Sequence, residues 1–452
     1  MTKWIVLFAI AGCSIPTKHA SSGDDDAMSD AGSGSGSGSG SAATTVVQLT
    51  VLSTSFDGMP DTGAIALFRD PAGATISDGL VDSAGHAQAE LPNGGSVTVI
   101  RITDQSPTER DVAMTTITGV KPGDKLVAGS TLSPRAFPGN TTTMSVAFTP
   151  YAASYSYMFY TVCGGTGGSS GTATLYFYDA CHGAKFDLVA VATSSDESDV
   201  RYVVVPDVTY AANGSITVPN TWSTTNGFVA TLTNVPTGIS SLALTHSTFL
   251  GESPSAPGDA SAMSPAPGIV SLTAPYVPGI GSRSELELAL HHDSASGFQT
   301  FSARIASTAG TQGLDLSQQS LPFIVGAISE TPTTIAWDQL DSGTPDARFV
   351  TWSGHWSVGT RTDYINWTIE DAGTGTSLTL PGLPSKYGEY DPAQATGVAL
   401  GHGGVEYVDY DRLNGYDDAR AYGPNLVDTF DDLGVFVDMP VQRRVSRNAL
   451  FL

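Results

Sequence analysis

The chain has 452 residues, in which 44 Asp and Glu outnumber 20 Lys and Arg, so its formal net charge is −24. This acidic balance repels nucleic-acid phosphates and anionic lipid head groups, which excludes a nucleic-acid partner and a polybasic membrane binder. Gly, Ser and Thr are abundant and helix formers are scarce, which indicates a β-rich protein.

Residues 1–12 have the pattern of an export signal. Lys3 gives a positive start, and an apolar run extends from Ile5 to Ile10. The run is too short for a membrane-spanning helix, which needs about 20 apolar residues. The segment Ile10-Ala11-Gly12-Cys13 resembles the lipobox of bacterial lipoproteins, and the resemblance implies that Cys13 becomes the lipidated first residue of the mature protein.

The residue after the cysteine bears on location. Ser14 resembles the choice that sorts lipoproteins to the outer membrane, whereas an Asp would favour the inner membrane. We therefore expect a lipid-anchored protein of the outer membrane, facing either the periplasm or the cell surface. The alternative is an ordinary cleaved export signal in which Cys13 is incidental.

Residues 13–43 are expected to form a flexible tether. They contain almost no large apolar side chains, and Asp24-Asp25-Asp26 precedes an unbroken Gly-Ser alternation. Such a segment cannot bury enough surface to offset the entropy lost on ordering. A Gly-rich coil of about 30 residues would hold the first domain on the order of 30 Å from its anchor.

The remaining residues, about 410, exceed one ordinary core and predict two to four β domains. In residues 44–148, Val47, Leu49 and Val51 alternate as they would in a strand. The runs 56–67, 82–87 and 91–99 resemble the carboxypeptidase regulatory-like domain, a prealbumin-like β-sandwich. The resemblance implies a non-catalytic unit that serves as a spacer or a sugar-binding addition.

Residues 149–252 are expected to form a second β domain that holds two cysteines. If Cys13 carries lipid, Cys163 and Cys181 are an even pair in an oxidising compartment, which predicts a disulfide. Closing this loop would contribute roughly 3 kcal/mol on the chain-entropy model. A zinc site that adds His182 is the alternative.

One glycine-rich segment of this domain matches the residue pattern of a catalytic motif. Residues 167–171, Gly-Gly-Ser-Ser-Gly, match the nucleophile elbow of serine hydrolases. That motif needs a helix after the serine, but residues 172–178 alternate as a strand does. The sequence therefore favours a hairpin tip.

Residues 253–268 are rich in Pro, Ser and Ala and are expected to be a linker. Residues 269–452 show more strand and turn patterns and are expected to form a C-terminal β region of one or two domains. Within it, the adjacent His291 and His292 point to opposite faces of a strand and so cannot chelate one metal together.

An acidic tract near the end is the best candidate for a metal. Its oxygen ligands fit calcium, the single cofactor that the sequence suggests, although Gly415 and Arg420 depart from the EF-hand spacing. A solvated acidic turn is the alternative reading. The residues of the candidate loop are Asp409, Asp411, Asn414, Asp417 and Asp418, and Asp428, Asp431, Asp432 and Asp438 follow it.

Aromatic residues offer another route to binding. Trp352 and Trp356 are separated by an even number of residues, so in a strand they share one face and would form a platform on which sugar rings stack. Packing in a sandwich core explains the same spacing.

The sequence as a whole predicts tandem β-sandwich domains of an all-β class. No nucleophile, metal or acid–base motif survives its structural context, so we expect a non-catalytic envelope lipoprotein that acts in adhesion, envelope organisation or glycan binding. Its expected partners are the membrane, through the lipid anchor, and a glycan or an envelope protein. A secreted hydrolase of an unrecognised family is the alternative.

Overall fold

The computed structural model describes residues 46–53, 59–129, 141–178, 181, 183–250, 253–255, 259–281, 283–293, 297–306, 310–318, 321–340, 343–410, 413–421 and 442–448. Strands hold 64% and helices 4% of these residues, which confirms the expected all-β fold. The described strands form five sheets that pack around several apolar cores. None of the helices in these ranges is long and apolar enough to cross a membrane.

The first region is a small sandwich. A sheet in the order β4-β1-β7 faces β3-β2-β5-β6, and the alternating residues Val47, Leu49 and Val51 are buried between the two layers as their spacing predicts. Its strands are β1 (Val46–Val51), β2 (Ile65–Arg69), β3 (Thr75–Leu80), β4 (His86–Glu90), β5 (Gly95–Ser106), β6 (Glu109–Val120) and β7 (Lys125–Ala128).

The second region is one sheet of eight strands in the order β14-β8-β11-β10-β9-β12-β13-β15, with its own apolar core. Residues 141–147 were expected to end the first domain, but they form β8, which pairs with β11 and β14 of this sheet. The strands are β8 (Thr141–Ala147), β9 (Tyr155–Thr161), β10 (Gly164–Ser169), β11 (Thr172–Tyr178), β12 (Lys185–Ser194), β13 (Val200–Thr209), β14 (Ser215–Thr217) and β15 (Ser223–Thr224).

The third region packs β20-β16-β23 against β17, β21 and β22 around a further core. The interval 253–268 is not a linker as expected, because β18 and β19 within it both pair with β17. The elements are β16 (Asn226–Val235), β17 (Ile239–Leu250), β18 (Ser253–Ser255), β19 (Asp259–Met263), β20 (Gly268–Tyr276), β21 (Arg283–His292), β22 (Gly297–Ala306), β23 (Thr311–Asp315) and the 3-10 helix η1 (Leu316–Gln318).

The fourth region completes a sheet of 14 strands that runs through the molecule. Its strand β27 pairs in parallel with β6 of the first region, and β31 lies between β22 and β30. The elements are β24 (Phe323–Glu330), β25 (Thr334–Leu340), β26 (Ala347–Val358), β27 (Arg361–Asp371), β28 (Ser377–Thr379), η2 (Ser385–Tyr390), β29 (Ala399–Leu400), β30 (Gly404–Tyr410), α1 (Tyr416–Ala419) and β31 (Gln442–Asn448).

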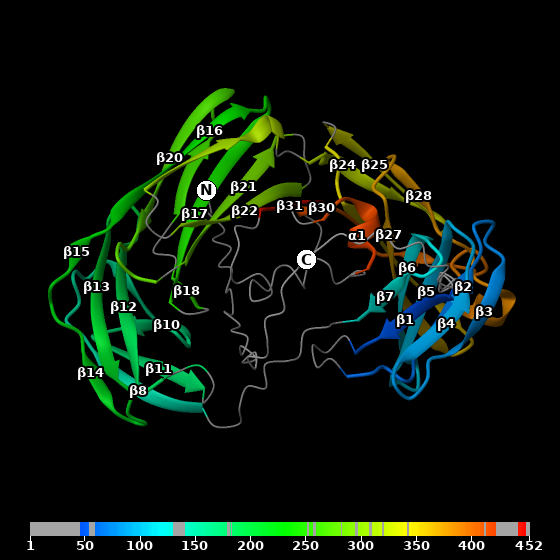
Figure 1. Ribbon diagram of the computed structural model, residues 1–452, viewed down its shortest axis with the longest axis horizontal. Coiled ribbons are helices and arrows are strands. Elements are labelled where there is room, and N and C mark those ends of the chain that lie inside the picture. The colour runs from blue at the N-terminus through cyan, green and yellow to red at the C-terminus, as the bar shows by residue number, and fades with distance from the viewer. Residues whose placement is uncertain are drawn as a thin grey trace, which may run out of the picture.

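Figure 1 shows the consequence of these pairings for the shape. The green strands of the second and third regions lie on the left, the blue and cyan strands of the first region lie on the right, and β22, β31 and β30 lie between them. Together the regions follow a curve in this view. The eight-stranded sheet, with β8, β10, β11 and β14, lies at its left end.

Candidate functional site

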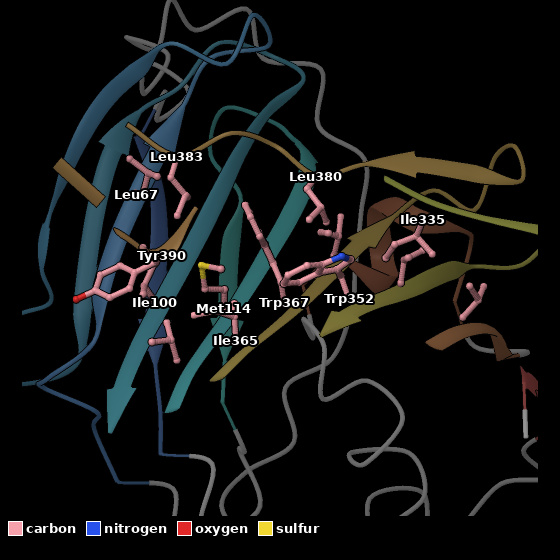
Figure 2. Packing of buried hydrophobic residues seen from close by; sticks show 14 of the residues in the cluster. Leu67, Ile100, Met114, Ile335, Trp352, Ile365, Trp367, Leu380, Leu383 and Tyr390 are labelled. Carbon is pink, nitrogen blue, oxygen red and sulfur yellow. The ribbon is translucent and has the colours of Figure 1, made fainter. Parts of the chain in front are cut away.

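The tryptophans expected to form a sugar platform lie in the protein core. Trp352 and Trp356 share a face of β26, but the exposed fractions of their side chains are 0% and 4%. Their indole N–H groups donate to backbone carbonyls, Trp352 to Thr331 at 3.0 Å and Trp356 to Glu389 at 3.2 Å. Figure 2 shows Trp352 beside Trp367 within the cluster. The ligand-binding prediction for this pair is wrong, because the β24-β25-β28 sheet and η2 pack against the face that they share.

The acidic tract is partly held by internal contacts. Asp417 pairs with Lys121 and Arg420, and Asp418 accepts from the backbone and the side chain of Asn414, both at 2.9 Å. Asp411 and residues 422–441, with the later aspartates, lie outside the described residues. No group of three His, Cys, Asp or Glu side chains within the described ranges has a metal-binding arrangement, and calcium binding stays a prediction.

The cysteine prediction has a clear outcome. Cys163 and Cys181 form a disulfide with a Cα–Cα distance of 5.2 Å, so the predicted bridge is confirmed and neither thiolate is left to ligate zinc. Cys13 and the expected tether lie outside the described residues, as does His182.

The two weaker motifs also have structural explanations. Residues 164–169 and 172–178 form the β10–β11 hairpin, so strand follows Ser169 where a nucleophile elbow needs a helix. His291 is exposed and His292 is half-buried at the end of β21.

A concavity on the outer face of the eight-stranded sheet is the candidate site. It has a volume of about 430 Å³ and is open to solvent along one side. We call it the outer-face groove. The residues lining it are Ser145, Val146, Ala147, Thr166, Gly167, Ser169, Thr172, Ala173, Thr174, Tyr176 and Ser215.

The strand register explains how these residues meet. Ser215 of β14 lies opposite Ser145 of β8, and Ser145 lies opposite Thr174 of β11. The β10–β11 register, continued by one residue, places Gly167 opposite Thr174, and Gly167 in turn lies opposite Met158 of β9. Alternate residues of paired strands share a face, so this row of hydroxyl groups, with glycine at its end, runs across four strands.

The same face is covered elsewhere on the sheet. Val189 and Val191 of β12 are buried against Leu250, Val277 and Ile280. This contact occupies the half of the outer face formed by β12 and β13. On β8, β11 and β14 this face is exposed, with Tyr176 exposed by 51% of its surface, whereas β10 also contacts β18 of the third region.

The chemistry of the groove is polar and uncharged. None of the described lining residues is an Asp, Glu, His, Lys or Arg, so its serine hydroxyls have no general base among them. Within the described part of the chain, the side-chain hydroxyls of Ser145, Thr174, Tyr176 and Ser215 have no hydrogen-bond partner. Hydroxyls that are not used by the protein are available to a ligand.

Sequence reasoning identified the glycine-rich hairpin but not the groove. The signal available was period-two alternation of polar and apolar residues in 172–177, which places Thr172, Thr174 and Tyr176 on one face. The sequence of 172–177 does not predict that Ser145 of β8 and Ser215 of β14 lie beside these residues, because that depends on which strands pair.

Comparisons with known proteins add no family. No protein-family model and no curated protein matches the chain. Among solved structures, the Bacillus anthracis TIE protein is 11% identical over 60% of this chain, with a TM-score of 0.14, and the chain spans about half (49%) of that protein. A candidate adhesin from Bacteroides ovatus is 9% identical over 55% of this chain and 71% of its own, with a TM-score of 0.11. Overlaps with such TM-scores support no assignment.

Proposed function

We propose that this protein is a non-catalytic binding protein of the cell envelope, anchored by lipid at Cys13 and carried on the 13–43 tether. Its β-sandwich units would serve adhesion, envelope organisation or glycan contact. The observation that supports binding is the outer-face groove, because it combines free hydroxyl groups with an exposed aromatic ring and has no acid or base among its described lining residues.

The anchor and the binding activity are tested separately. The Cys13→Ser variant should leave the membrane fraction and appear in the soluble fraction, because it removes the lipid that this proposal makes the anchor. Membrane fractionation and mass measurement of the mature N-terminus check this. Unchanged membrane association with an unmodified N-terminus would contradict lipid anchoring.

Binding is tested with the full chain in detergent micelles. Immobilised protein should capture material from detergent-solubilised envelopes, and esterase, protease and glycosidase substrates should remain intact. Reproducible turnover that one Ser, His, Asp or Glu substitution abolishes without unfolding would refute the non-catalytic proposal.

A further inference from the structure

Strand β10 contains four glycines, and the structural reasons for glycine differ among these positions. This strand lies between β9 and β11 within the sheet, where glycine is unfavourable because it packs nothing and loses much backbone entropy on folding. A glycine in such a strand needs a reason, which is a special backbone angle, crowding at Cβ, or the close approach of another molecule.

Contacts or backbone angles within the protein disfavour other residues at three of the four glycines. Gly164 has a φ of +128°, which disfavours other residues. A Cβ on Gly168 would lie 2.5 Å from Cε2 of Phe159. A Cβ on Gly165 would lie 3.0 Å from Cδ1 of Tyr160, which is a tight contact.

Gly167 is not required in this way. It is exposed, its φ is not positive, and the nearest atom to an added Cβ is Sδ of Met158 at 3.9 Å, an ordinary contact. An added Cβ would therefore meet no clash, and a β-branched residue favours a strand more than glycine does. Neither crowding at Cβ nor the φ angle accounts for Gly167, which is the one glycine of β10 among the described lining residues of the outer-face groove.

We infer that the outer-face groove binds an extended, uncharged, polyhydroxylated ligand, a neutral oligosaccharide chain, and that Gly167 is glycine so that a sugar ring can approach the sheet. The inference rests on the proposed binding function and names its ligand class. Ser215, Ser145 and Thr174 present hydroxyls in one row, which suits the hydroxyls of a sugar.

Apolar contacts and charge point to the same class. Tyr176 and Met158 flank the row and are 51% and 37% exposed, so they offer surfaces to the C–H faces of sugar rings. The described lining residues carry no charged side chain that would favour an acidic sugar. Within the groove β10 and β11 are both paired on two sides, so a peptide strand could be added only at the edge strand β14 and not over the row of hydroxyls.

The test is isothermal titration of the full chain in detergent micelles with linear neutral hexasaccharides of glucose or mannose and with a galacturonic acid hexamer, at low and high salt. A neutral chain should bind with little salt dependence. Gly167→Val should weaken binding about tenfold or more by adding a side chain within the groove, and Tyr176→Ala should weaken it about tenfold by removing the stacking ring.

The matched control is Gly313→Val. Gly313 is also an exposed strand glycine with ordinary φ and no atom within 4 Å of an added Cβ, but it lies in β23, in the third region. It should bind like the unaltered chain. Melting temperatures should not fall for either valine variant.

Several results would overturn the inference. They are equal binding by Gly167→Val and the unaltered chain, binding of the acidic hexamer alone, no binding of any neutral hexamer, or capture of an uncharged peptide in the groove. If Gly167→Val still captures envelope material as the unaltered chain does, the proposed binding function survives and the groove is not its site. If the unaltered chain captures nothing, the proposed function itself fails.

Discussion

His246 of β17 is an ionisable side chain enclosed in an apolar core. Its exposed fraction is 0%, its ring stacks on Phe228 with centroids 4.5 Å apart, and Tyr276 meets it edge-on at 5.2 Å. Among the described residues neither imidazole nitrogen has a hydrogen-bond partner. Burial therefore disfavours the imidazolium and lowers the pKa of His246 to about 4, from 6.5.

This residue should make stability depend on pH. Between about pH 6.5 and 4 the unfolded chain binds a proton that the folded chain excludes, so the free energy of unfolding falls as pH falls. The full effect corresponds to about 3 kcal/mol. Urea unfolding of the third region at a series of pH values measures it.

The control is His246→Phe, which keeps an aromatic ring against Phe228 and removes the titration. Its free energy of unfolding should fall less steeply over the same pH interval, whereas the contribution of surface carboxylates stays the same. An identical slope in both proteins would show that His246 is not excluded from protonation.

Trp352 should behave as a core residue, and its substitution measures this. Trp352→Ala should lower the free energy of unfolding by about 3–5 kcal/mol, because it removes a buried ring and leaves a cavity. Denaturant unfolding followed by circular dichroism reports the loss. Tyr364→Ala on the adjacent strand is the control, since Tyr364 is 43% exposed and should cost much less. Similar costs would contradict the core assignment.

The outcome for the tryptophans shows how far local spacing reaches. Even spacing correctly places Trp352 and Trp356 on one face of β26. Which side of the strand is covered depends on residues distant in the chain, such as Ile335 of β25 and Leu380 after β28, which pack in the same cluster. The spacing of residues within 349–358 therefore cannot predict which face of β26 is buried.

At the scale of elements, alternation was a good guide to strands and composition was a poor guide to boundaries. The interval 253–268 looks like a linker because Pro, Ser and Ala dominate it. Pro254 nevertheless lies in β18, which pairs with β17 alone, and an edge strand tolerates a residue without a backbone N–H. The pairing of β18 and β19 with β17 therefore makes 253–268 part of the third region, and composition does not predict such pairing.

The β10–β11 hairpin shows a similar division between what is local and what is not. The strand pattern after Ser169 correctly excludes a nucleophile elbow, and the cysteine pair correctly predicts the bridge between Cys163 and Cys181. The outer-face groove needed the lateral order β14-β8-β11-β10. Because β14 joins β8 in parallel from about 70 residues further along the chain, its hydroxyl row could not be derived from either strand by itself.

At the scale of the whole molecule, the parallel pairing of β6 with β27 joins segments about 250 residues apart. A buried ion-pair cluster lies at this junction. Arg110 of β6 donates to Asp363 of β27, with Nη2–Oδ2 at 2.5 Å, and Arg361 donates to the same carboxylate with Nε–Oδ1 at 2.6 Å. Burial by itself would raise the pKa of Asp363, but the hydrogen bonds from the two arginines outweigh it and lower the pKa.

Removing that carboxylate should uncouple the first and fourth regions. Asp363→Ala leaves Arg110, whose side chain is 9% exposed, with the half-exposed Glu389 as its remaining ionic partner among the described residues. Burying Arg110 with one partly exposed ionic partner should lower the free energy of unfolding by about 3–5 kcal/mol, and the retained Glu389 contact favours the lower end of this range.

Lys386→Ala is the matched control, because its pair with Asp78 also joins these two regions but Lys386 is 63% exposed. An exposed pair contributes only about 0–1 kcal/mol, so this variant should unfold almost as the unaltered chain does. Calorimetry of the full chain distinguishes the two, and equal melting curves for both variants would show that the Asp363 cluster does not hold the junction together.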